Sequence, residues 1–440
     1  MAADNVKIPT ELRDRLLFTL MVLAIYRIGV HVPTPGVDGN AVLEFFQAQG
    51  GGIFGLFNTF TGGALEQFSV LALGIMPYIS ASIIFQLLQS AVPQLEALKK
   101  EGEAGRKKLN QYTRYATVIL ALAQGYAMSR WFMNSSSPTG DALVNTPMFG
   151  GFIPFQIMTP ITLAAGTCFI MWLGEQINEK GVGNGASLII FAGIAAGIPS
   201  GAISLYDMLS KGDMSLPVAL IVLGGMVAAI AGIVYVEVAQ RRIPIHYSQR
   251  GAGKQAMQQQ QSHLPLKLNF ANVIPPIFAS SLLLFPATMA QFIDTPWMQN
   301  ISQQLTPTGS IYNVLFVGLI IFFCFFYTEI VFNPTEVSDN LKKYGGFVPG
   351  IRAGRSTADY IKRVLDRLTV FGSIYLSIVC IVPTLIVSKM NLPFYFGGTS
   401  LLILVGVALD TSQQIQSHLL TARYEGLKKG IKVRSRRVQY

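Results

Sequence analysis

The sequence has few charged residues for its length. Asp, Glu, Lys and Arg make up 13% of its 440 residues, whereas 51% are hydrophobic. About a quarter of the residues in typical soluble domains are charged, because charge is needed to cover the surface. The composition therefore excludes an ordinary soluble protein, and most of the chain is expected to face lipid.

The sequence is also poor in residues that bind metals or form disulfides, with three cysteines and four histidines. Cys168, Cys324 and Cys380 each stand alone in an apolar stretch, so neither a metal site nor a disulfide is expected. No Ser, His and acid set and no carboxylate pair falls at a common depth, so we expect no enzyme activity and no cofactor. The GVGNG motif at residues 181–185 follows no strand, which favours a flexible helix start over a dinucleotide site.

Apolar stretches near the roughly 20 residues needed to cross a bilayer recur about ten times. They cover residues 16–32, 70–92, 115–132, 154–173, 183–200, 216–237, 273–290, 311–332, 368–387 and 394–414. The first lacks a small-residue cleavage site, so it is interpreted as a retained helix and not as a removed signal. We predict an all-α polytopic membrane protein with about ten transmembrane helices.

The basic residues are distributed unevenly between the loops. Of the 33 Lys and Arg residues, 29 lie in the two ends or in alternate connections. These segments are residues 1–15, 93–114, 174–182, 239–270, 333–367 and the tail 415–440. The other loops contain only Lys211 and Lys389. Since Lys and Arg concentrate in cytoplasmic loops, both termini are predicted to be cytoplasmic and the number of spans even.

Ten spans divide near Asp213 into two groups of five, an amino-terminal half (1–213) and a carboxy-terminal half (214–440). An odd group size reverses the orientation of the second half, which is the topology of an inverted repeat. Such a repeat places a pore or a binding site between its halves.

An inverted repeat is also typical of secondary solute transporters, which are the alternative function, and a poreless insertase or scaffold is a third. Ion-coupled transporters keep ionisable residues near the bilayer centre. Here Glu237, Glu329 and Asp410 fall toward span ends, where snorkelling or capping accounts for them. Arg27 is expected to have a structural partner. These positions argue against the transporter.

Residues 50–77, GGGIFGLFNTFTGGALEQFSVLALGIMP, are apolar but too rich in glycine to form one smooth helix. Thr61 is expected to cap a short helix from about Ala64 to Leu73, which Gly74 and Pro77 would separate from the following span. Two interpretations stay open, a re-entrant helix on the outer side and a bent packing helix.

Six segments resemble those of a known family. They are TGGALEQFSVLALGIMPYISASIIFQLL from Thr61, KKEGEAGRKKLNQYTRY from Lys99, MWLGEQINEKGVGNGASLIIFAGI from Met171, SHLPLKLNFANVIPPIFASSLLLFPAT from Ser262, VFNPTEVSDNLKKYGGFVPGIRAGRSTADYI from Val331 and PFYFGGTSLLILV from Pro393. The chain resembles the SecY family, the channel-forming subunits of the bacterial Sec protein translocase, from about Arg15 to beyond Glu425.

The resemblance implies an hourglass channel of two five-helix halves around a central pore. Such a channel passes unfolded secretory polypeptides across the bacterial inner membrane and releases transmembrane segments sideways into lipid. The resemblance favours the re-entrant interpretation of the glycine-rich stretch, because residues 58–73 resemble the plug helix that closes the outer side of the pore. The implied plug residues are Phe60, Gly62, Gly63, Leu65, Phe68 and Leu71.

The resemblance also implies a ring of aliphatic side chains at the narrowest point of the pore. Its members are Ile75, Ile79, Ile190, Ile277 and Ile403. Without the family, each would be an ordinary packing or lipid-facing residue. At a further ring position, where relatives commonly have isoleucine, this sequence has Ala186. A branched aliphatic ring offers nothing to bind an ion, so a narrow constriction dewets while a chain of any sequence can pass.

The family's lateral gate lies between the second and third spans on one side and the seventh and eighth on the other. The candidate polar contacts there are Ser80, Ser82, Gln86 and Asn272. The alternative for each is an ordinary interhelical hydrogen bond of about 0.6 kcal/mol.

The loops 239–270 and 333–367 are longer than the topology requires. The resemblance makes them docking sites for ribosomal RNA or for the SecA motor ATPase, whereas the alternative is solvated charge that faces anionic lipids. The candidate docking residues are Arg241, Arg242, Arg250, Lys254, Arg352 and Arg355. Relatives often have proline at Ala353, so a looser tip is expected here. The other implied partners are the small membrane subunits SecE and SecG and substrates that carry signal sequences.

Overall fold

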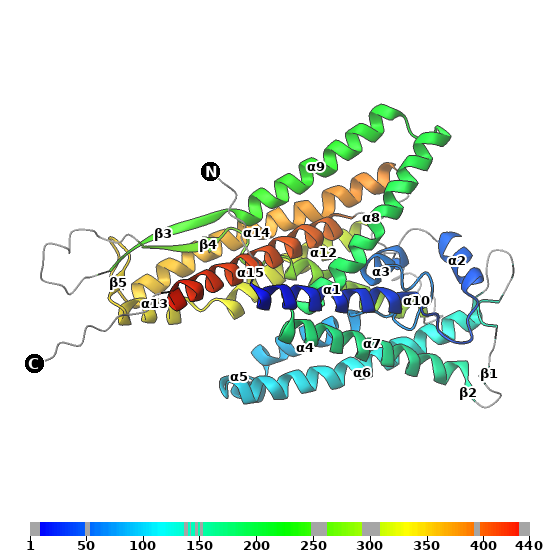
Figure 1. Cartoon of the computed structure of the whole chain (residues 1–440), viewed down its shortest axis with the longest axis horizontal. Helices are drawn as coiled ribbons and strands as arrows, with labels where there is room; N and C mark the ends of the chain where they lie inside the picture. Colours follow the sequence, from blue (N-terminus) through cyan, green and yellow to red (C-terminus); the bar gives the residue numbers. More distant parts are fainter. Residues whose placement is uncertain are drawn as a thin grey trace, which may run out of the picture.

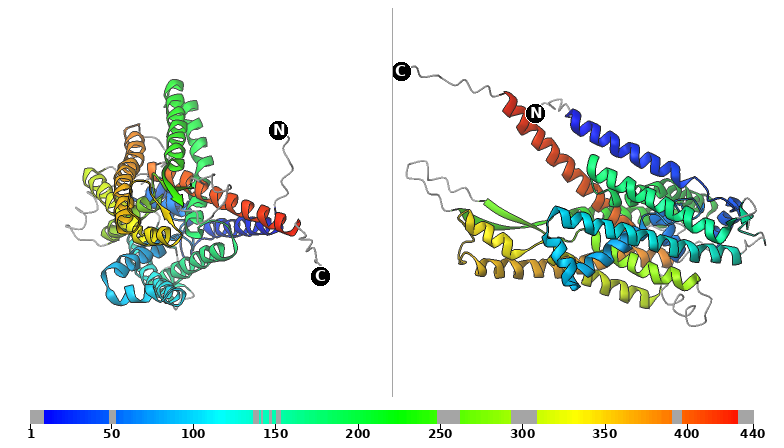
Figure 2. Two further views of the ribbon diagram at one scale, coloured as in Figure 1. Left: turned by 90° about the vertical axis from the view of Figure 1, so that its left-hand side faces the viewer. Right: turned by 90° about the horizontal axis from the view of Figure 1, so that it is seen from below.

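The computed structural model describes residues 9–48, 53–135, 140, 142–145, 148–149, 153–247, 262–292, 309–390 and 397–430. Over these ranges the protein is an elongated bundle of helices with a small sheet at one end (Figure 1). The start of α1 and the end of α15 both lie toward the end that carries the sheet (Figure 2).

Ten helices coincide with the ten predicted spans, which confirms that part of the prediction. They are α1 (Thr10–Val30), α4 (Met76–Ala91), α6 (Glu103–Asn134), α7 (Phe155–Lys180), α8 (Gly185–Lys211), α9 (Leu216–Val238), α10 (Ile274–Phe292), α12 (Ser310–Val331), α14 (Arg355–Met390) and α15 (Gly398–Gly430). Five of them, α7, α8, α9, α12 and α14, hold windows long and apolar enough to cross a membrane by themselves.

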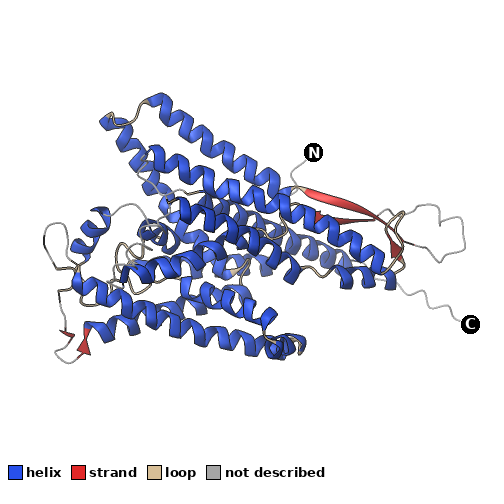
Figure 3. Cartoon of the chain, turned by 180° about the vertical axis from the view of Figure 1, so that it is seen from behind, coloured by secondary structure: helices blue, strands red, loops and turns tan. Residues whose placement is uncertain are grey.

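Among the described residues, four shorter helices lie between the long ones. They are α2 (Gly39–Ala48), α3 (Ile53–Thr61), α5 (Pro93–Lys100) and α13 (Pro334–Lys343). Helices dominate the view from behind (Figure 3). The two ends of the fold differ, since α2 and α3 lie at the end opposite the sheet while α13 lies beside it (Figure 1).

Helix boundaries follow local chemistry. The side chain of Asn184 caps α8 by accepting a hydrogen bond from the Ser187 amide, and Gly212 ends that helix in the left-handed conformation, with φ 80°. The GVGNG motif is thus a capped helix start, in agreement with the sequence-based interpretation. The second predicted span begins as a helix only at Met76, because Gly74 takes φ 58° and Pro77 occupies the first turn of α4.

The two long basic loops contain a three-stranded antiparallel sheet that the all-α prediction omitted. Its strands are β3 (Gln240–Tyr247), β4 (Ser262–Lys267) and β5 (Gly346–Phe347), in the order β4-β3-β5. In the register of this sheet, Gln240 of β3 pairs with Lys267 of β4. His246 of β3 pairs with Phe347 of β5, so one sheet joins the two loops. A second, two-stranded sheet of β1 (Met148–Phe149) and β2 (Ile153–Pro154) lies at the other end.

Much of the predicted loop and tail is helical. The helix of the ninth span begins at Arg355, inside the loop predicted for residues 333–367, and α15 continues through the predicted tail to Gly430. Parts of the basic loop 333–367 and of the basic tail are therefore carried on extensions of membrane helices.

Candidate functional site

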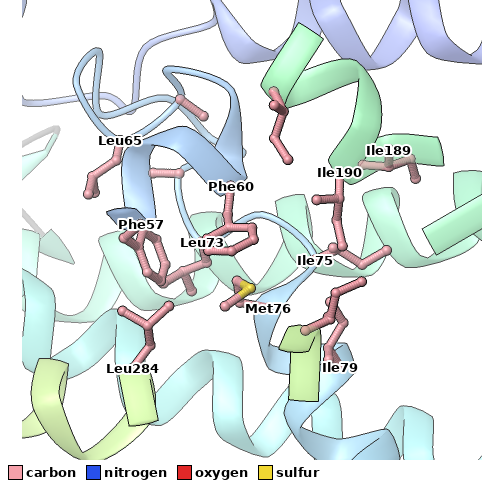
Figure 4. Close-up of a cluster of buried hydrophobic side chains, with 14 of the residues drawn as sticks. Phe57, Phe60, Leu65, Leu73, Ile75, Met76, Ile79, Ile189, Ile190 and Leu284 are labelled. Carbon is pink, nitrogen blue, oxygen red and sulfur yellow. The ribbon is translucent and has the colours of Figure 1, made fainter. Parts of the chain in front are cut away.

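The five predicted ring isoleucines lie in one continuous buried hydrophobic cluster. Ile75, Ile79, Ile190, Ile277 and Ile403 are between 0% and 7% exposed, and all belong to this cluster. Ile75 and Ile79 lie one helical turn apart, and the Ile79 amide donates to the Ile75 carbonyl at 3.1 Å. Figure 4 shows both side chains close to Ile190 of α8, with Phe60 of α3 to their left. The structure therefore places Ile75, Ile79 and Ile190 close to the end of α3, while Ile277 and Ile403 belong to the same buried core.

Ala186 lies one helical turn before Ile190 on α8. It is partly buried and packs against the same cluster. Its methyl group is smaller than the isoleucine side chain that relatives commonly have at this position.

The short helix of the glycine-rich stretch lies before Thr61 and not after it, so the helix predicted from about Ala64 to Leu73 is wrong. The helix is α3, which ends at Thr61, and residues 62–75 form a series of turns. Thr61 does not cap a following helix, because its Oγ1 donates to the Asn58 carbonyl of the preceding turn at 3.2 Å. Gly62 and Gly63 take φ of 69° and 87°, which ends the helix and reverses the chain.

The turns after α3 are built into the amino-terminal part of the fold. Leu65 and Phe68 are fully buried, and Leu71 is 3% exposed. The Thr34 amide donates to the Phe68 carbonyl and the Val70 amide to the Val32 carbonyl, both at 2.9 Å. This segment is therefore tied by its backbone to the chain that follows α1.

Phe68 is held in an aromatic pocket at the carboxy-terminal end of α6. Its ring centroid lies 4.1 Å from that of Phe132, which also neighbours Trp131 and Phe46. Phe68 adopts φ 41°, in the left-handed region that favours glycine. A buried phenylalanine with that backbone conformation marks a segment that its surroundings hold firmly.

The junction between α3 and the turns is clamped by α1 and α8. Tyr26 Oη donates to the Thr61 carbonyl at 3.1 Å, and Arg27 Nη1 donates to the Gly62 carbonyl. A Cβ atom on Gly62 would lie only 2.6 Å from Gly193 Cα of α8, so only glycine allows this approach. Arg27 thus has the structural partner that the sequence led us to expect.

Replacement of Arg27 by leucine is expected to weaken the attachment of the end of α3 to α1. Loss of a hydrogen bond from a charged donor costs about 1.5 kcal/mol. In a channel of the kind that the resemblance implies, spontaneous openings should therefore become about tenfold more frequent. Single-channel recording in planar bilayers measures this frequency. The control is Arg130→Leu, which removes the exposed arginine of α6. An opening frequency equal in the two variants would contradict the clamp.

The predicted gate residues do not all lie together. Ser80, Ser82 and Gln86 lie half-buried on α4, and Gln86 Nε2 donates to Ser82 Oγ at 3.2 Å. Asn272 instead lies against α15, where its Nδ2 donates to both carboxylate oxygens of Asp410 at 3.1 and 3.2 Å. The assignment of Asn272 to the lateral gate stays a prediction, since its described side-chain partner lies on α15. Asn272 precedes α10 with φ 53°, so a turn directs it away from the helix that follows.

Two serines that the sequence-based search missed lie where α10 meets α4. Ser280 and Ser281 are buried on α10 and donate to the Ile277 carbonyl at 2.9 and 2.8 Å. The Ser281 hydroxyl also lies 3.9 Å from the Met76 sulfur at the start of α4. The sequence shows this serine pair inside an apolar span. A pair of this kind does not stand out, because serine hydroxyls in membrane helices commonly donate to a carbonyl of the preceding turn.

A groove of about 840 Å³ separates α4 and α5 from α12 and α14. Its walls include Gln86 and Gln89 of α4, Thr328 and Glu329 of α12 and Asp366 of α14. The groove runs between the two sets of helices named for the lateral gate, with α4 on one side and α12 on the other.

The candidate docking residues that the structure describes are all exposed. Arg241 and Arg242 lie on β3, Arg352 lies in the turn before α14, and Arg355 is the first residue of α14. The other two, Arg250 and Lys254, lie outside the described residues.

The turn around Arg352 is held by side-chain hydrogen bonds. The Ser338 hydroxyl donates to the Gly354 carbonyl at 2.7 Å, and the Thr357 hydroxyl donates to the Arg352 carbonyl at 2.9 Å. These bonds constrain the turn, and the looser tip expected from Ala353 stays a prediction.

Ten long helices around a continuous buried apolar core, five of them apolar enough to cross a membrane, define a polytopic helical membrane protein. The SecY family model matches residues 69–412. Given this match, the chain belongs to the SecY family.

Relatives match almost the whole chain. The protein translocase subunit SecY of Pseudomonas aeruginosa is 49% identical over 425 residues, which cover 96% of this chain and 94% of that protein. The subunit of Escherichia coli strain K12 is 47% identical over 94% of this chain and 93% of its own. That of Aquifex aeolicus is 45% identical over 94% and 96%.

Solved structures share the fold. A protein-conducting channel superposes with a TM-score of 0.67 at 18% identity, over 92% of each chain. Sec61 from a canine ribosome-channel complex of the endoplasmic reticulum gives a TM-score of 0.65 at 18% identity, again over 92% of each chain.

Proposed function

We propose that this protein is the central channel of a bacterial Sec translocase. It passes unfolded secretory polypeptides across the inner membrane and releases hydrophobic segments sideways into lipid. The observation that carries the proposal is the packing of five dispersed isoleucines into one buried cluster against α3, in a chain of the SecY family. Transport of a purified secretory precursor into vesicles reconstituted with the full chain tests it.

The isoleucine cluster acts as the seal. Aliphatic side chains offer no hydrogen bond or charge, so a constriction lined by them excludes water and ions when closed. The same side chains have no fixed polar partner to lose, and they can yield to a passing polypeptide of any sequence.

The plug is α3 together with its junction at Gly62 and Gly63. Phe57 and Phe60 of α3 are 6% and 5% exposed within the cluster, so α3 covers the seal from the outer side. The positive φ values at the two glycines supply a pivot. Residues 64–73, which the resemblance assigned to the plug, remain with the amino-terminal half.

The lateral gate lies where α4 meets α10 and where the groove separates α4 from α12. Contacts such as that between Ser281 and Met76 are weak, which suits a gate that opens at a cost of a few kcal/mol. A hydrophobic signal sequence supplies this cost through preferential binding to the open state.

The molecule is oriented with the sheet, both ends of the chain and the basic loops in the cytoplasm. The charge distribution supports this orientation, as does the position of the start of α1 and the end of α15 on the sheet side. The halves 1–213 and 214–440 form the inverted repeat. The sheet and the turn at Arg352 form the docking surface for the ribosome or for the SecA motor, and SecE, SecG and anionic lipids complete the assembly.

Reversal of charge at the docking surface is expected to impair transport of secretory precursors, while the variant protein itself still inserts into the membrane normally. In Arg352→Glu the exposed turn keeps the hydrogen bond to its backbone carbonyl. The new carboxylate repels a polyanionic or acidic partner, so transport should fall about tenfold. A vesicle transport assay, with equal amounts of inserted protein, measures the effect. Arg13→Glu, at an equally exposed arginine of α1, is the control. Wild-type transport by Arg352→Glu would remove the docking assignment.

A further inference from the structure

The short loop between α7 and α8 is held from two sides. On one side, the Val182 amide donates to Thr19 Oγ1 of α1 at 3.0 Å. On the other, the Gly183 amide donates to Gln414 Oε1 of α15 at 2.8 Å. The loop therefore joins the amino-terminal half to the last helix of the carboxy-terminal half.

Gly183 permits this contact through its backbone conformation. It has φ 97°, and a Cβ atom there would lie 2.6 Å from Leu188 Cδ1 and 3.3 Å from Thr411 Oγ1 of α15. Only glycine brings the loop this close to α15 without strain.

The same face of α15 is bound to the docking hairpin, which we define as β3 and β4. Lys267, the last residue of β4, donates from Nζ to Gln413 Oε1 at 3.2 Å. Its Nζ also lies 3.8 Å from a carboxylate oxygen of Asp410. Asp410, Gln413 and Gln414 are spaced i, i+3 and i+4, which places them on one side of the helix.

The chain that follows the hairpin is held to the same region. Asn269 Nδ2 donates to Glu237 Oε1 of α9 at 2.7 Å and to the Asn272 carbonyl at 3.0 Å. Asn272 in turn donates to Asp410. The base of the hairpin is thus fixed to α9 and α15 and cannot move without displacing them.

A polar pocket of about 390 Å³ lies at this junction. It is lined by Asn184 and Ser187 of α8 and by Asp410, Gln413 and Gln414 of α15, among others. Water can therefore enter between the surfaces of α8 and α15. Beside this pocket, the hydrogen bond from Gly183 to Gln414 connects the loop before α8 to α15. Such an exposed bond contributes little stability, so it can break and form again as the halves move.

We infer that the face of α15 that carries Asp410, Gln413 and Gln414 couples the docking hairpin to the amino-terminal half. Displacement of the hairpin by a docked partner moves Lys267 and the helix bound to it. The helix then pulls on, or releases, the loop at Gly183 and through it α1 and α8. This inference rests on the proposed function for its biological purpose, but the coupling itself is a property of the chain that can be measured alone.

Hydrogen exchange of the full chain in lipid nanodiscs tests the coupling, with mass spectrometry of peptides that cover residues 181–187. Gln414→Leu removes the acceptor and should speed exchange there about threefold to tenfold. Gln414→Glu keeps an acceptor and should exchange as the wild type does. The decisive variant is Lys267→Met, whose described polar contacts go to α15 and not to the loop. It should also speed exchange at residues 181–187 by at least about twofold.

The matched control is Lys342→Met, which removes a lysine of α13 on the other basic loop. If Lys267→Met alters exchange in the hairpin alone, or if Gln414→Leu leaves residues 181–187 unchanged, the coupling is overturned. Transport of a secretory precursor should fall in Gln414→Leu and in Lys267→Met. In the variant that combines both substitutions, transport should fall no further than in the more affected single variant. Additive losses would contradict a shared route. If the wild type itself transports nothing, the proposed function fails, while the exchange results still decide the coupling.

Discussion

The double variant Phe57→Ala and Phe60→Ala should raise the ion conductance of reconstituted bilayers by about tenfold or more. Both rings are almost fully buried, and they pack within the cluster that contains the ring isoleucines (Figure 4). Truncation of a buried phenylalanine costs about 3 kcal/mol or more and leaves a cavity. Here the cavity lies over the constriction, so water and ions gain a path. Conductance across planar bilayers at matched protein density measures the result.

Phe322→Ala is the matched control, because it removes the same side chain from α12 at a position that is 51% exposed. Its conductance should equal that of the wild type. A double variant that stays as tight as the control would mean that α3 does not seal the channel. Deletion of residues 58–73 is a poorer test, since it also removes Leu65 and Phe68 from the buried core.

A crosslink between α3 and α10 should abolish transport almost completely. Phe57 of α3 and Leu284 of α10 are both buried, and Figure 4 shows them facing each other. Cysteines at these two positions, joined by oxidation or by a short bismaleimide, would hold the plug across the constriction. Transport before and after reduction of the disulfide, in a background with the three native cysteines replaced, measures the effect.

The contrasting pair is Phe68→Cys with Phe132→Cys, whose rings touch at a centroid distance of 4.1 Å. This crosslink should leave transport close to the wild-type rate, because residues 64–73 stay with the amino-terminal half while α3 moves. Loss of transport with both pairs would show that the whole segment 58–73 moves as one body. Normal transport with both would remove α3 as the plug.

The spans were predictable because they depend on a single strong property. Length and hydropathy place a membrane helix wherever about 20 apolar residues occur, and tertiary contacts change only its ends. Gly74 and Pro77 correctly marked the start of the second helix. The position of α3 was not predictable in this way, since Thr61 has the chemistry of a cap at either end of a helix. Its hydroxyl bonds backward to Asn58, and the contact between Gly62 and Gly193 that fixes the chain reversal is long-range.

Among the candidate site residues, too, local sequence predicted some placements, while others depended on long-range contacts. Ile75 and Ile79 could be assigned to one helix face from their spacing, but Ile277 and Ile403 could be joined to them only by resemblance to a family. The partner of Asn272 could not be predicted, because its position near a span says nothing about its backbone angle. A φ of 53° directs it to Asp410, a partner 138 positions later in the sequence.

The sheet in the basic loops escaped prediction because its third strand, β5, is two residues long and comes from a separate loop. Register across two loops depends on the folded arrangement of α12, α13 and α14, which no local pattern encodes. The arginines on β3 were correctly expected to be exposed, since charge alone decides that.

Because β5 pairs with β3, the two basic loops present their charges at a fixed spacing. A partner that contacts one loop then meets the other at a high effective concentration, and the second contact needs no further loss of translational freedom. Two individually weak ionic contacts can therefore produce a long-lived complex. Such a complex also dissociates quickly once one of its two contacts is lost, which suits a channel that must exchange one partner for another.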